Sequence, residues 1–168
     1  LNARSGKRLR SIDTLDIMNI IGMIVVSGNV RRSAQIAIGD HDDLDYLRAK
    51  RWDLGNIPNW RAMSNNSVAC DDISQLPEEF WEGYKGNGEP YGLINLTAAR
   101  KMGRTGEEQY PDPEVMGFNP CAEQSLADKE TCCLAEIYLP NIESEEELKK
   151  VATYLYRISK HSLAIKCS

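Results

Sequence analysis

Apolar and polar residues follow one another along this chain with periods that predict short helices and short strands in turn. From Ser11 to Val25, apolar residues recur every three or four positions, which is the spacing of a helix with one buried face. Ser11 suits the N-cap of this helix, and Ser27-Gly28-Asn29 ends it. A period of two residues follows from Val30 to Ile38 and predicts a strand.

The rest of the chain continues this alternation. Further helical segments are predicted at 42–50, 77–84, 97–102 and 145–162, and extended segments at 62–70, 91–96 and 134–139. Segments rich in Gly, Asn and Pro separate them, at 52–60, 86–88 and 103–117. Ser144 and Glu147 form a capping-box pattern before the last helix. Short helices and strands in alternation predict an α/β fold.

Composition narrows the class of protein. The chain has 168 residues, of which 42% are hydrophobic and 27% charged, as in ordinary globular domains. We expect a single partial domain over residues 1–168, and a fragment of a longer protein because no Met begins the chain. The net charge of −5 argues against a polyanion-binding surface, and no apolar run approaches the roughly 20 residues that span a bilayer. Neither nucleic acid nor a membrane is therefore an expected partner.

Five cysteines bear on the compartment and on the chemistry. They are Cys70, Cys121, Cys132, Cys133 and Cys167. An odd number of cysteines, in a chain of this size without a secretory signal, favours thiols in a reducing compartment, so we expect a cytoplasmic protein. The cluster at 121–133 has no Cys-x-x-Cys pair and no nearby His, which argues against zinc and any other metal site. The glycine-rich segments lack a phosphate-binding P-loop pattern.

The run Asn119-Pro120-Cys121-Ala122-Glu123 places an amide, a thiol and a carboxylate at alternate positions. Alternate residues of an extended segment face the same side, so these three side chains are expected to converge on one site. Cys132 could reach the same site if the chain turns back. On composition alone, Cys121 would be a buried structural thiol, Glu123 a surface carboxylate and Asn119 a turn residue before proline.

Asn119-Pro120-Cys121-x-Glu123, with Cys132 further on, resembles the active-site finger loop of ribonucleotide reductases. Three more blocks, in the same order, are similar to the adenosylcobalamin-dependent (class II) reductases. They are Ser5-Gly6-Lys7-Arg8-Leu9, the stretch from Val26 to Ile36, and Met63-Ser64-Asn65-Asn66-Ser67-Val68. The resemblance implies part of a ten-stranded α/β barrel from the catalytic region. There are two alternatives. One is a fragment of an iron-dependent class I large subunit, and the other is a binding or assembly module without activity.

The resemblance also implies roles for individual residues in ribonucleotide reduction, the step that makes DNA precursors. A thiyl radical on Cys121 would abstract the 3′ hydrogen of a ribonucleotide. Glu123 would act as general base for the 3′ hydroxyl, and Asn119 would hold the ribose hydroxyls. Cys132 matches the reducing cysteine of the family, whose partner thiol we do not find in this chain. Cys133 and Cys70 are expected to be packing thiols.

The cofactor and partners implied by the resemblance are adenosylcobalamin, a ribonucleoside di- or triphosphate, and a dithiol reductant such as thioredoxin. No segment looks like a cobalamin-binding module, so the isolated chain is expected to be inactive. An incomplete barrel leaves strand edges that favour self-association. Candidate substrate-binding residues are Ser64, Asn65 and Asn66, in a run that is either a loop or pocket lining, and Arg31, whose guanidinium suits phosphate.

Overall fold

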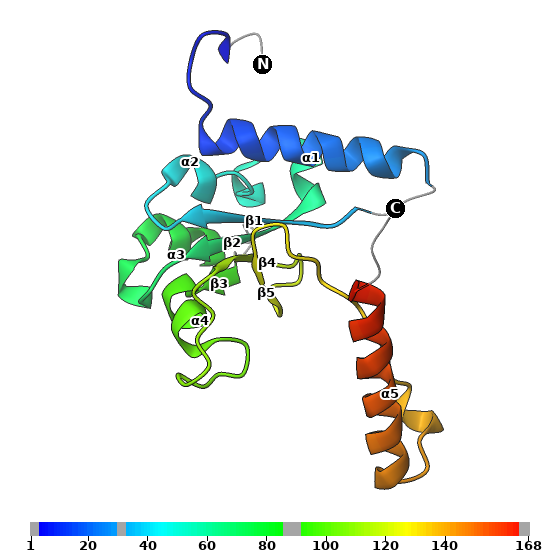
Figure 1. Ribbon diagram of the computed structural model, residues 1–168. Helices are drawn as coiled ribbons and strands as arrows, with labels where there is room; N and C mark the ends of the chain where they lie inside the picture. Colours follow the sequence, from blue (N-terminus) through cyan, green and yellow to red (C-terminus); the bar gives the residue numbers. More distant parts are fainter. Residues whose placement is uncertain (1–3, 30–32, 86–91, 165–168) are drawn as a thin grey trace. The chain divides into compact units, whose positions relative to one another are not determined.

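A computed structural model describes residues 4–29, 33–85 and 92–164 of the chain (Figure 1). The chain forms two compact units, Leu1–Glu130 and Thr131–Ser168, which are described separately. The expectation of one domain over the whole chain is not decided by this division and stays a prediction.

The first unit is built on a three-stranded parallel sheet. Its strands are β1 (Gln35–Asp40), β2 (Ser64–Ala69) and β3 (Gly92–Ile94), and β2 lies in the centre. The helix α1 (Ser11–Ser27) precedes β1, and α4 (Leu96–Met102) follows β3. The connections between the strands contain the helices α2 (Leu44–Leu47) and α3 (Glu78–Lys85) and the 3-10 turns η2 (Trp52–Leu54), η3 (Asn59–Met63) and η4 (Ile73–Gln75). The predicted α/β class is confirmed.

A two-stranded antiparallel hairpin completes this unit. It consists of β4 (Val115–Phe118) and β5 (Ser125–Ala127), with Phe118 opposite Ser125. The hairpin and α1 lie on opposite sides of the parallel sheet (Figure 1). A Cβ placed on Gly117 would lie 3.7 Å from Ile38 Cδ1, an ordinary contact distance, so β4 passes close over β1.

The core lies between the sheet and the helices α1, α2 and α3. Its buried apolar residues are Ile12, Leu15, Tyr46, Leu47, Ala49, Val68, Leu76 and Phe80. The Tyr46 hydroxyl lies 2.8 Å from Ala37 O and 2.9 Å from Ser67 O, so its hydrogen can serve either carbonyl. The Tyr46 ring covers Gly39 so closely that a Cβ at that position would overlap the ring. Tyr46 therefore ties α2 to both β1 and β2.

Several predicted boundaries move. The expected strand 30–38 is found as β1, which begins at Gln35 and continues to Asp40, and residues 30–32 lie outside the described residues. The expected helix 42–50 shortens to α2, where the Asp43 side chain accepts from Tyr46 N at 3.0 Å and caps the first turn. The expected extended segment 62–70 is β2, and the expected loop 52–60 contains η2 and the start of η3.

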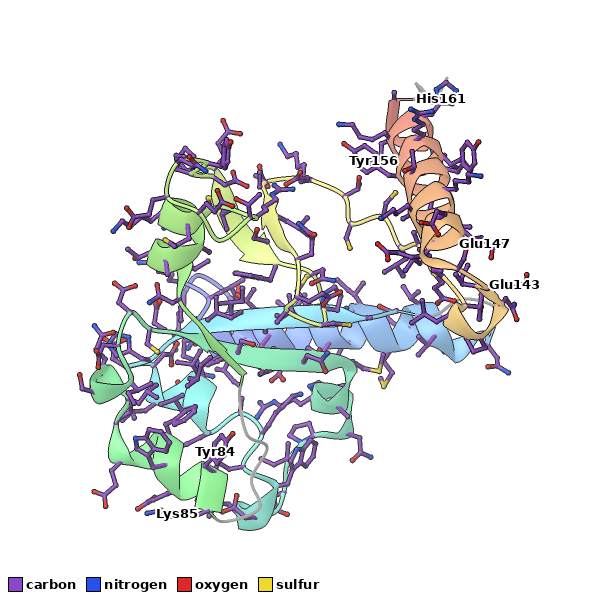
Figure 2. All side chains as sticks on the ribbon, turned by 90° about the horizontal axis from the view of Figure 1, so that it is seen from below. Tyr84, Lys85, Glu143, Glu147, Tyr156 and His161 are labelled. Atoms are coloured by element: carbon purple, nitrogen blue, oxygen red, sulfur yellow. The ribbon has the colours of Figure 1, made fainter. Side chains whose placement is uncertain are left out.

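The second unit contains η5 (Leu139–Asn141) and α5 (Glu145–Ala164). Glu147 N donates to Ser144 Oγ at 3.1 Å, which confirms the predicted cap. Figure 2 shows Glu147, Tyr156 and His161 spaced along α5. The predicted strand 134–139 is wrong, because residues 131–164 as described contain no strand for it to pair with, and Leu134 is 87% exposed. Among the described helices, none combines the length and apolarity of a membrane span.

Candidate active site

Residues 119–124, which we call the Cys121 loop, connect β4 to β5 and are closed at their base by one residue. Asn119 N donates to Gln124 O at 3.0 Å, and Gln124 N donates to the side-chain Oδ1 of Asn119 at 3.0 Å. Ala122 N donates to Asn119 O at 2.9 Å, which makes a tight turn across Pro120 and Cys121. The expectation of an extended segment is therefore wrong, because these bonds curl the chain back on itself.

Asn119 and Glu123 meet because of that curl. Asn119 Nδ2 donates to Glu123 Oε1 at 2.6 Å, a short bond to a charged acceptor. Asn119 is only 5% exposed, so its amide is fixed by the loop, whereas Glu123 is exposed. The structure thus brings the side chains of Asn119 and Glu123 into contact. That these two side chains and Cys121 act on one substrate stays a prediction.

Cys121 faces a small cavity between the loop and the sheet. The cavity has a volume of about 240 Å³ and is lined by Ile36, Asn65, Asn66, Ser67, Gly92, Pro120, Cys121 and Ala122. A Cβ on Gly92 would lie 2.7 Å from Ser67 Oγ, so the missing side chain helps to keep this space open. Gly92 is not among the predicted site residues, whereas Ser67 ends the polar run from Ser64 that is expected to be a loop or pocket lining. The period of two along β2 could have indicated Ser67, since it shares a face with Asn65.

The three candidate substrate-binding residues of β2 occupy different surroundings. Asn65 lines the cavity beside Cys121, and its Nδ2 donates to Pro120 O at 2.7 Å. Ser64 Oγ donates to Asn66 Oδ1 at 2.8 Å, and both residues are buried. Ser64 borders a larger cavity of about 540 Å³ that also touches β1 and α1. The run is therefore a strand and not a loop, and Asn65 is the member that contacts the Cys121 loop.

The other candidates lie elsewhere. Arg31 is outside the described residues. Cys132 and Cys133 are exposed residues of the second unit. The approach of Cys132 to Cys121 stays a prediction, and the exposure of Cys133 does not fit the packing role expected for it. Cys70 is half-buried against the core, and burial, followed by the charges of Asp71 and Asp72, raises the pKa of its thiol. A thiol held protonated in this way suits the packing role predicted for it.

Within the described residues, no three His, Cys, Asp or Glu side chains come together in a way that could hold a metal ion.

Comparison with known proteins shows which proteins the chain is similar to. The chain is 41% identical over 163 residues to the adenosylcobalamin-dependent ribonucleoside-triphosphate reductase of Lactobacillus acidophilus, and 41% identical over 164 residues to that of Lactobacillus leichmannii. A probable reductase of the same name from Dictyostelium discoideum is 38% identical over 166 residues. These matches cover 95% of this chain. The chain is a homologue of one segment of these reductases.

The homologous segment is a modest part of the reductases themselves. The chain spans 22% of the length of the two Lactobacillus proteins and 21% of the Dictyostelium protein. No family model matches the chain, and no solved structure matches it. The blocks that suggested the class II reductases in the sequence are thus supported by similarity across nearly the whole chain.

Proposed function

We propose that this chain supplies the thiol-bearing loop of an adenosylcobalamin-dependent ribonucleotide reductase. The observation that carries the proposal is the hydrogen bond between Asn119 and Glu123 in a tight loop whose tip, Cys121, faces a cavity. In this proposal the Cys121 loop is the finger loop of a ten-stranded α/β barrel, and β1 to β3 are three of its strands. The substrate is a ribonucleoside triphosphate, in keeping with the names of the relatives.

The chemistry assigns one task to each group. A thiyl radical on Cys121 takes the hydrogen atom from C3′, giving a thiol and a carbon radical at C3′. Glu123 takes the proton of the 3′ hydroxyl, for which a carboxylate within hydrogen-bond reach is suited. The 2′ hydroxyl accepts a proton and leaves as water. Two thiols, of which Cys132 is one, become a disulfide and supply two electrons and two protons, one proton to the departing 2′ hydroxyl and one to C2′. Glu123 then returns its proton to the 3′ oxygen, and Cys121 returns its hydrogen atom to C3′, which regenerates the thiyl radical.

Asn119 orients this site. Its amide holds Glu123 by one N–H group, and in this proposal Asn119 and Glu123 together bind the ribose hydroxyls. Ser67 adds a hydroxyl to the cavity wall, which is the kind of lining that a sugar needs. Arg31 is retained as a candidate for a substrate phosphate.

Adenosylcobalamin would generate the radical when bound to the whole enzyme. The residues described here do not fit the cofactor by themselves, because the cavity beside Cys121 has about 240 Å³, below the range of drug-sized pockets and far too small for a corrin ring. No step is therefore assigned to a cofactor-binding residue of this chain. A dithiol protein such as thioredoxin would reduce the disulfide, and a cytoplasmic location would suit that exchange.

A chimera tests the proposal. Residues 1–168 would replace the homologous segment of the Lactobacillus leichmannii reductase, and the purified protein would be incubated with adenosylcobalamin, a dithiol and each ribonucleoside triphosphate. We expect deoxynucleotide formation by the chimera, and none by the isolated chain. A chimera that folds and binds the cofactor but forms no deoxynucleotide would contradict the proposal and favour a binding or assembly module. In sedimentation, self-association of the isolated chain is the expected behaviour.

A further inference from the structure

We propose that Asn65 is a positioning residue that holds Cys121 against the sheet. Its Nδ2 donates to the carbonyl oxygen of Pro120 at 2.7 Å, although 55 positions of sequence separate the two residues. This distance is at the short end of N–H···O bonds in proteins. Asn65 belongs to the central strand β2, in register with Ile36 of β1, so the donor is carried by a rigid element.

The acceptor in this bond is the group that leads directly into Cys121. The peptide unit between Pro120 and Cys121 is planar, so a restraint on the oxygen of Pro120 is also a restraint on the nitrogen and Cα of Cys121. On the other side of that oxygen, the proline ring fixes φ of Pro120 near −65°. One hydrogen bond from the sheet therefore sets where the backbone of Cys121 begins.

The bonds inside the loop do a different task. The Asn119–Gln124 bonds close its base, and the bond from Ala122 N to Asn119 O shapes its tip. These bonds fix the shape of the loop but do not connect its tip to the sheet. Asn65 makes that connection, on the same wall of the cavity that Cys121 faces. The width of the cavity beside the thiol is thus set by Asn65.

This arrangement changes the role expected for Asn65. The amide that was a candidate for binding substrate is engaged with the protein backbone, so Asn65 acts through Cys121. A thiol that must approach one carbon atom of a substrate depends on such placement, because small displacements of reacting groups lower rates steeply. The catalytic consequence rests on the proposed function, whereas the contact between Asn65 and the loop does not.

Hydrogen exchange in the 168-residue chain tests the contact without any activity. The reporters are the amides of Ala122 and Gln124, both of which donate within the loop. In Asn65→Ala and in the equally sized Asn65→Asp, we expect exchange at pH 7 to be roughly fivefold faster or more, the effect of losing one hydrogen bond. Asn59→Ala, which truncates an exposed amide in η3, should leave both rates unchanged. Unchanged rates in both Asn65 variants would overturn the proposal.

A pH series separates the hydrogen bond from simple packing. Below the ordinary pKa of an aspartic acid, about 3.9, the side chain of Asn65→Asp becomes a donor again. Relative to Asn65→Ala at the same pH, its loop protection should then recover. Parallel profiles for the two variants, with no recovery, would show that the carbonyl of Pro120 is not held by a donor at position 65.

Kinetics of the chimera test the consequence for catalysis. Asn65→Ala should lower kcat about tenfold or more while KM for the triphosphate changes little, because a positioning residue does not bind substrate. A raised KM with unchanged kcat would instead make Asn65 a substrate ligand. If the chimera is inactive with Asn65 intact, the proposed function fails, and the exchange measurement still decides whether Asn65 holds the loop.

Discussion

The side-chain Nδ2 of Asn119 lies 2.6 Å from Oε1 of Glu123, across a loop whose tip carries Cys121. The same amide accepts from Gln124 N through its oxygen, so one buried side chain both closes the loop and holds the carboxylate. The geometry of the candidate site therefore depends on the hydrogen bonds of Asn119. It does not come from an extended segment in which alternate side chains face one side.

Asn119→Ala should destabilise the first unit. The substitution leaves Gln124 N without its side-chain acceptor in a half-buried loop, at a cost of about 1–3 kcal/mol in the free energy of unfolding. Urea denaturation of the 168-residue chain measures this. Asn59→Ala is the matched control, because it removes an exposed amide and should change the free energy of unfolding by less than about 0.5 kcal/mol. Equal effects of the two substitutions would contradict the role of Asn119.

Ala122→Gly should stabilise the chain. Ala122 has a φ of 65°, in the left-handed region where a Cβ costs about 1–2 kcal/mol. Glycine removes that cost but has more freedom in the unfolded chain, so we expect a net gain of up to about 1 kcal/mol. The control is Ala98→Gly in α4, where the same change should destabilise by about 1 kcal/mol. Destabilisation by both substitutions would argue against the observed conformation of the loop.

Gly39→Ala should disrupt the contact between α2 and the sheet. A Cβ at this position would overlap the ring of Tyr46, which is 2% exposed and cannot move away without breaking the core. We expect a loss of about 1–3 kcal/mol in thermal or urea unfolding. A Cβ at Gly28 meets no atom within 4 Å, so Gly28→Ala serves as the control. A neutral Gly39→Ala would mean that Tyr46 does not pack there.

The ion pair between Arg104 and Glu130 should make stability sensitive to acid. Hydrogen bonding from Arg104 lowers the pKa of Glu130 from 4.5 to about 2. A carboxyl whose pKa is lower in the folded state stabilises that state above pH 4.5, and this contribution disappears as the pH falls through about 2. The difference in the free energy of unfolding between the wild type and Arg104→Gln should therefore shrink over that range.

Solvent limits the size of this effect. The side chains of Arg104 and Glu130 are 39% and 35% exposed, so water and salt screen the pair. Lys101→Gln is the control. It also removes one positive charge, but Lys101 lies in α4 and pairs with Glu108, not with Glu130. If Arg104→Gln and Lys101→Gln gave the same pH profile, the lowered pKa of Glu130 would not be due to Arg104.

Sequence reasoning succeeded where local signals decide the structure. The helix from Ser11 and the helix after Ser144 follow from apolar spacing, and both are found, although the N-cap of α1 is Arg10 and not Ser11 as expected. The strand expected at 134–139 is not found because β propensity needs a neighbouring strand, which residues 131–164, the described part of that unit, do not provide. Local pattern also cannot reveal contacts between distant residues, so the bond from Asn65 to Pro120 could only come from the folded structure.

The site itself was found in part. The resemblance indicated Asn119, Cys121 and Glu123, and the structure joins Asn119 to Glu123. The expectation of alternate residues on an extended segment is wrong, because the bonds made by Asn119 turn the chain and bring Glu123 back. Cys132 lies in the other unit, so its approach to Cys121 stays a prediction.

The most direct test of the central claim uses a 3′-tritiated ribonucleoside triphosphate and the active chimera. While Cys121 holds the abstracted tritium as a thiol, part of it exchanges with water before the rest returns to C3′, and this released fraction is measured. If Cys121 takes the 3′ hydrogen, Cys121→Ser should abolish both tritium release and deoxynucleotide formation, because an alkoxyl radical is much harder to form than a thiyl radical. Cys133→Ser removes an exposed thiol from the second unit and should keep both activities. Cys132→Ser should still release tritium but lose multiple turnover. Tritium release that persists in Cys121→Ser would contradict the account.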